Sequence, residues 1–156
     1  MNFEHERKEV RKTVDALGMP VDPKIQNAVA LFNYAGFPTV SSCAGHIERG
    51  STTPYIGVSS SDKRENKTLG SRLRQAAGAF NSRHSLSGKL KVRVERIEGF
   101  EGDEWGVTTL PVSGGMVYVP EGPYQEQRTA PSLEMLQKGR KVINSFANYL
   151  VKQYGR

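Results

Sequence analysis

Residues Val21–Gly50 read VDPKIQNAVALFNYAGFPTVSSCAGHIERG, a helix signal followed directly by a strand signal. Asp22 is a typical N-cap residue and is followed by proline, which favours the first helical position. Apolar residues then recur at helical spacing as far as a glycine that is typical of a helix C-terminus. The next segment is short and begins with β-branched residues. The sequence therefore predicts a helix over Asp22–Ala35 and a strand over Pro38–Cys43.

The same reasoning extends outward along the chain. Apolar periodicity near 3.6 predicts helices, and short apolar or alternating runs between turn residues predict strands. The predicted elements are a helix over Phe3–Leu17, a strand over Pro54–Ser59, a basic helix over Asp62–Phe80, a strand over Leu90–Ile97, a hairpin of Trp105–Val112 with Met116–Val119, and a final helix capped by Ser132.

These elements predict an α+β fold. We expect a mixed or antiparallel sheet of about four to five strands, packed by three to four helices that include a long C-terminal helix. The residues of the final helix that are expected to pack inward are Leu133, Leu136, Val142 or Ile143, Phe146, Leu150 and Tyr154.

Length and composition indicate one domain spanning residues 1–156. A chain of 156 residues and 17.3 kDa has room for a single core. No apolar run approaches the roughly 18 residues of a membrane span, and the charged N-terminus does not have the pattern of a secretory signal. We therefore expect a cytoplasmic protein without membrane contact. Cys43 is the only cysteine, so an internal disulfide is excluded.

Basic residues are concentrated in one segment of a chain whose net charge is +6. Residues 63–93 hold nine Lys or Arg and one acidic residue, Glu65. Such a segment suits a phosphate-rich partner such as RNA, whereas a merely solvated helix face is the alternative interpretation. The candidate nucleic-acid-binding residues are Lys63, Arg64, Lys67, Arg72, Arg74 and Arg83.

Reactive and polar side chains gather in PTVSSCAGHIERG, residues Pro38–Gly50. Cys43 and Arg49 have the spacing of the phosphate loop of cysteine phosphatases. Cys43 and His46 could instead share a zinc ion, but this would require two further ligands, so no metal site is predicted and zinc is not expected. A third interpretation is a binding loop, with His46 or Arg49 contacting an anion or acting as acid or base. A purely structural role for the segment stays open as well.

A family resemblance rests on this segment. The run VDPKIQNAVALFNYAGFPTVSSCAGHI, Val21–Ile47, resembles the N-terminal signature of the tRNA wybutosine-synthesis methyltransferase family, with its VD-x-x-I helix and T-x-SSC-x-G-R-I motif. The family's arginine is replaced here by His46. The motif is also similar to the S-C-x-G-H segment of small uncharacterised bacterial and phage proteins.

The resemblance implies an S-adenosylmethionine-dependent enzyme that modifies tRNA. By position it assigns cofactor contacts to Ser41, Ser42 and Gly45, and it places Cys43 at the active site, where we add His46 and Arg49 as candidate catalytic residues. The leading hypothesis is a small basic protein that binds RNA or a nucleotide-like ligand, with methyl transfer as an open question. The alternatives are a non-catalytic module that binds nucleic acid or protein, and a cysteine-dependent phosphatase or hydrolase.

Overall fold

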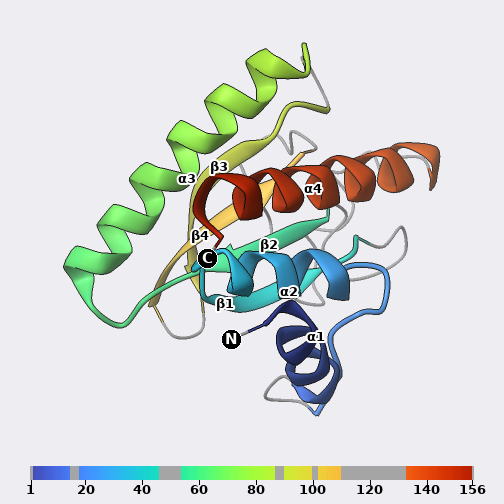
Figure 1. The fold of residues 1–156 in the computed structure, drawn as a ribbon, viewed down its shortest axis with the longest axis vertical. Helices are drawn as coiled ribbons and strands as arrows, with labels where there is room; N and C mark the ends of the chain where they lie inside the picture. Colours follow the sequence, from blue (N-terminus) through green and yellow to red (C-terminus); the bar gives the residue numbers. More distant parts are fainter. Residues whose placement is uncertain are drawn as a thin grey trace, which may run out of the picture.

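The structure, a computed structural model, describes residues 2–14, 18–45, 54–86, 90–99, 102–109 and 133–155. These residues form four helices and a four-stranded sheet, which confirms the predicted α+β fold (Figure 1). The elements in chain order are α1 (Phe3–Lys12), α2 (Gln26–Tyr34), β1 (Thr39–Cys43), β2 (Tyr55–Val58), α3 (Lys63–Arg83), β3 (Arg93–Gly99), β4 (Gly102–Thr108) and α4 (Leu133–Tyr154).

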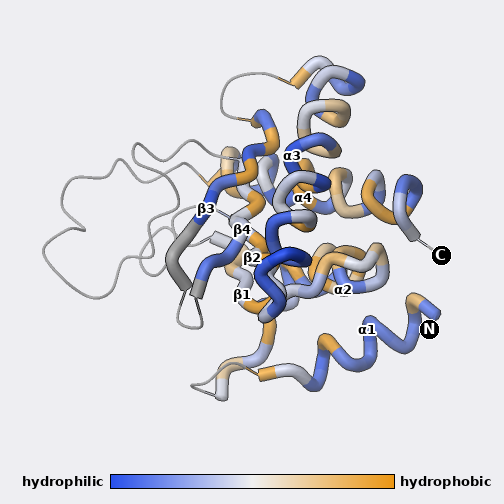
Figure 2. Tube along the Cα trace, turned by 90° about the vertical axis from the view of Figure 1, so that its left-hand side faces the viewer, coloured by the Kyte–Doolittle hydropathy of each residue, from blue (hydrophilic) through white to orange (hydrophobic). Residues whose placement is uncertain are grey.

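The sheet is antiparallel throughout, with the strand order β1-β2-β4-β3. Helices α2, α3 and α4 lie together on one side of it, and α1 packs against α2 (Figure 2). The sheet face toward these helices is apolar, because Ile56, Val58 and Val107 point into the core and are fully buried. Among the described residues, no helix is long and apolar enough to cross a membrane.

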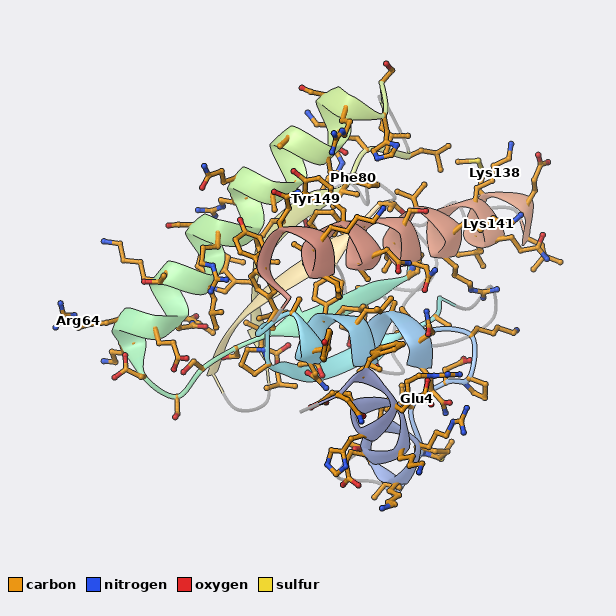
Figure 3. The ribbon with its side chains drawn as sticks, viewed as in Figure 1. Glu4, Arg64, Phe80, Lys138, Lys141 and Tyr149 are labelled. Atoms are coloured by element: carbon orange, nitrogen blue, oxygen red, sulfur yellow. The ribbon has the colours of Figure 1, made fainter. Side chains whose placement is uncertain are left out.

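Aromatic rings from three helices fill the centre of the core. Phe146 of α4 lies between Phe32 of α2 and Phe80 of α3, with ring centroids 6.0 and 5.3 Å apart. Tyr149 adds a further ring beside Phe80, at the contact between α3 and α4 (Figure 3). Edge-to-face pairs of this kind add to the stabilisation from burial alone. The three helices are therefore joined through one aromatic cluster.

Three helix boundaries differ from the prediction by more than one residue. Helix α3 ends at Arg83 instead of Phe80. Helix α1 ends at Lys12 instead of Leu17, because Thr13 is extended and Val14 forms a bridge with Pro20. Helix α2 begins at Gln26 instead of Asp22. The Asp22 carboxylate accepts from the backbone N–H of Lys24, and its carbonyl accepts from two later amides, so this residue caps a turn that leads into the helix.

The strand expected over Trp105–Val112 corresponds to β4, which begins earlier, at Gly102, and forms a hairpin that the sequence did not predict. The partner of β4 in the hairpin is the preceding strand β3, with Gly99 opposite Gly102, so the chain reverses between two glycines that the prediction overlooked. The second predicted strand, Met116–Val119, lies outside the described residues, as does Ser132. Most inward positions of α4 are confirmed, but Leu133 is 55% exposed because it lies in the first turn, at the end of the helix.

Candidate functional site

The sheet face opposite the helices carries polar side chains. Residues that are paired across antiparallel strands point to the same face, so the register defines its composition. One row across the four strands is Cys43, Tyr55, Thr108 and Arg93, and the next row is Ser41, Gly57, Gly106 and Glu95. We call these eight residues, together with Glu104 of β4, the polar face.

A buried carboxylate lies at one end of the polar face. Glu104 is 7% exposed, and its Oε2 accepts a hydrogen bond of 2.7 Å from the Ser41 hydroxyl. The two residues approach each other across β2, where Gly57 has no side chain. A Cβ atom on Gly57 would lie 2.2 Å from Ser41 Oγ and 2.5 Å from Glu104 Oε2. The pair therefore depends on glycine at this position.

A hollow of about 110 Å³ opens beside this carboxylate. It is lined by Val40 and Glu104 together with the three serines Ser59–Ser61 that lead into α3. We call it the Glu104 hollow. Val40 is 46% exposed and lies at a register irregularity of the edge strand β1, so it forms an apolar wall next to polar ones. The space is large enough for water molecules or for one polar group of a ligand.

The loop that follows β1 is held by an arginine from the far end of the chain. Arg140 of α4 donates from Nε to the Ala44 carbonyl at 2.7 Å and from Nη2 to the Gly45 carbonyl at 2.9 Å. Gly45 has a φ of +83°, which glycine adopts without strain, and its N–H points to Cys43 Sγ at 3.4 Å. Arg140 thus fixes the loop beside the half-buried thiol of Cys43.

We expect Arg140→Met to loosen this loop. The variant removes both donors, so local opening around Cys43 should become easier by roughly tenfold in population. Cys43 is the only cysteine, so its rate of alkylation by a thiol reagent reports this opening and should rise accordingly. Lys141→Met, at the neighbouring exposed position, is the matched control and should leave the rate unchanged (Figure 3). Equal rates in both variants would show that Arg140 does not hold the loop.

The structure separates the residues of the Ser-Ser-Cys segment. Ser41 and Cys43 share the polar face, whereas Ser42 pairs with the core residue Ile56 and lies on the helix-covered face. His46 and Arg49 lie outside the described residues. Binding of S-adenosylmethionine by Ser41, Ser42 and Gly45 and catalysis by Cys43, His46 and Arg49 stay predictions.

Metal ligands do not cluster in the described part of the chain, where no three His, Cys, Asp or Glu side chains gather. His5 lies in α1. His84 caps α3 and its ring lies 4.3 Å from that of Phe80.

The basic residues of α3 divide into two flanks of the helix. Lys63, Lys67 and Arg74 recur at intervals of four and seven residues, so they share one flank, and all three are exposed. Arg74 lies over the Trp105 ring of β4 at 4.6 Å. We call these three residues the basic stripe; it begins two residues after Ser61 of the Glu104 hollow.

The other basic side chains of α3 have different surroundings. Arg72 lies over the rings of Phe37 and Tyr154, at 4.8 and 4.5 Å, so it packs against the body of the protein. Arg83 shares that flank and is exposed, and Arg64 points away from the protein (Figure 3). The six candidates of the sequence analysis are therefore not one surface.

A second hollow, of about 140 Å³, lies between α1 and α2 and is lined by Arg7, Arg11, Pro23, Gln26 and Asn27. Arg7 already pairs with Glu4 at 3.0 Å and lies over the Phe3 ring. This hollow has no buried polar side chain comparable to Glu104, so we regard the polar face as the better candidate.

Three important residues of the site were missed by the sequence reasoning: Glu104, Gly57 and Arg140. A glycine inside a short apolar strand is a recognised signal of close approach, so Gly57 could have been noticed.

Comparison of the chain with known protein families, with curated proteins and with solved structures gave no match.

Proposed function

We propose that this protein binds RNA, with the basic stripe holding phosphates and the Glu104 hollow, next to the start of α3, contacting a base. The observation that carries the proposal is the basic stripe itself. Lys63, Lys67 and Arg74 are exposed on one flank, and within the described ranges no carboxylate forms an ion pair with them. Cations that are not neutralised within the protein are available to phosphates.

The surroundings of the stripe support the same proposal. Arg74 is placed over Trp105, which limits its motion and keeps its guanidinium at the surface. Trp105 is itself fixed, because its Nε1 donates to the Asn66 carbonyl of α3 at 2.8 Å. Phosphate contacts provide affinity without reading sequence, whereas contacts to base edges provide specificity. The Glu104 hollow lies next to the start of α3 and supplies polar groups that can contact base edges.

The test is binding of a fluorescein-labelled single-stranded RNA, followed by fluorescence anisotropy over a range of salt concentrations. We expect the triple variant Lys63→Gln, Lys67→Gln, Arg74→Gln to bind more weakly at low salt. Each lost phosphate contact lowers the slope of log K against log salt by about 0.7, so the slope should fall by about 2.

A matched control removes three cations from another helix. Arg7→Gln, Arg11→Gln, Lys12→Gln changes the net charge by the same amount on α1, and it should reduce affinity far less. Equal losses in both triple variants would indicate non-specific attraction to a basic protein. An unchanged slope in the α3 variant, or no RNA binding by the wild type at low salt, would contradict the proposal.

A further inference from the structure

Glu104 is a buried acceptor that the described residues satisfy only in part. A carboxylate offers about four acceptor positions when it is ionised, and burial is unfavourable unless hydrogen bonds fill them. Glu104 is 7% exposed and receives the hydroxyl of Ser41. In the described part of the chain, no Lys, Arg or His nitrogen lies within 4.0 Å of it. The group therefore has capacity for further donors.

Two serine hydroxyls in the wall of the Glu104 hollow are acceptors as well. A hydroxyl has one proton, and the Ser59 hydroxyl donates its proton to the Asp103 carbonyl at 2.8 Å. The Ser60 hydroxyl donates to the Glu65 carboxylate at 2.5 Å. Ser41 is committed to Glu104 in the same way. The protons of Ser59 and Ser60 are committed within the protein, so these hydroxyls and Glu104 can only accept from a ligand, and Ser60 Oγ already accepts from the backbone N–H of Asp62 at 3.2 Å. The hollow therefore favours N–H donors, with the Ser61 hydroxyl as its remaining polar wall group.

From this arrangement we infer that the Glu104 hollow recognises the exocyclic amino group of an RNA base. The inference rests on the proposed RNA binding and adds its base preference. The hollow accommodates the amino edge of a base, not the whole base, and Val40 offers an apolar surface at its wall. Cytosine, adenine and guanine carry such an amino group. Uracil presents a carbonyl oxygen at the position where cytosine has its amino group, and two acceptors repel each other.

The experiment compares fluorescein-labelled oligocytidine and oligouridine of equal length at one salt concentration. We expect the wild type to bind oligocytidine roughly tenfold more tightly. Glu104→Gln places an amide where the carboxylate was, and its NH₂ can donate to the uracil carbonyl. The preference should therefore fall to about twofold or less, or reverse.

Two further variants keep the test decisive. Glu134→Gln makes the same charge change at an exposed position of α4 and should retain the wild-type preference. Ser59→Ala removes one acceptor from the hollow and should lower the preference by a smaller factor, so it replaces Glu104→Gln if that variant does not fold by circular dichroism.

The outcomes separate the two proposals. Salt-dependent binding of both oligonucleotides with equal affinity would overturn the amino-group inference and leave RNA binding intact. A wild-type preference that Glu104→Gln does not alter would also overturn it, because the selectivity would arise elsewhere. Failure to bind either oligonucleotide at low salt would overturn RNA binding itself.

Discussion

Phe146→Ala should lower the free energy of unfolding by about 3 to 5 kcal/mol, the usual loss for a large aromatic side chain in a core. Phe146 is fully buried and contacts Phe32, Phe80 and Tyr149, so its removal leaves a cavity where three helices meet. Rigid neighbouring rings cannot collapse into that space. A domain of this size has only about 5 to 15 kcal/mol of stability, so the variant should be close to unfolding at physiological temperature.

Urea denaturation followed by circular dichroism gives this value directly. Leu133→Ala on the same helix is the control. Leu133 is 55% exposed, so its truncation should change the free energy of unfolding by no more than about 0.5 kcal/mol. A loss below about 1 kcal/mol for Phe146→Ala would mean that the aromatic cluster does not hold α2, α3 and α4 together.

The fold could be predicted where a local pattern had a single interpretation. Helix α3 was expected because Leu69, Leu73 and Phe80 recur on one side of a charged segment, and all three are buried. Boundaries were harder to predict because tertiary contacts set them. Nothing in the sequence near Leu17 indicates that Val14 bridges to Pro20 and so ends α1 early.

Only the part of the candidate site that lies within one strand could be predicted from the sequence. The alternation of a strand already implies that Ser41 and Cys43 share one face and that Ser42 lies on the other. Glu104 and Arg140 act on the same segment from 63 and 96 residues away in the sequence. The residues that Glu104 and Arg140 contact can be identified only when the strand order and the position of α4 are known. The acidic run Glu95–Glu104 has no local feature that distinguishes Glu104 as a buried carboxylate.

Gly57→Ala tests the arrangement that joins these distant residues. The added methyl group would lie 2.2 Å from Ser41 Oγ and 2.5 Å from Glu104 Oε2, far inside van der Waals contact. Gly57 is on β2, between β1 and β4, so the backbone has little room to move away. We expect a loss of about 1 to 3 kcal/mol in the free energy of unfolding, measured by urea denaturation. The Ser41–Glu104 hydrogen bond should break at the same time.

A double variant distinguishes this clash from a general effect of alanine in a strand. Ser41→Ala removes the nearer of the two colliding oxygens, so Gly57→Ala should be less destabilising in that background than in the wild type. Gly78→Ala on α3 is a control in which the added methyl group meets no other atom. Nothing lies within 4 Å of its added Cβ, so it should stabilise the helix by up to about 1 kcal/mol. Additive effects of Ser41→Ala and Gly57→Ala would show that the added methyl group does not collide with Ser41 Oγ, which would contradict the placement of the Ser41–Glu104 pair directly over Gly57.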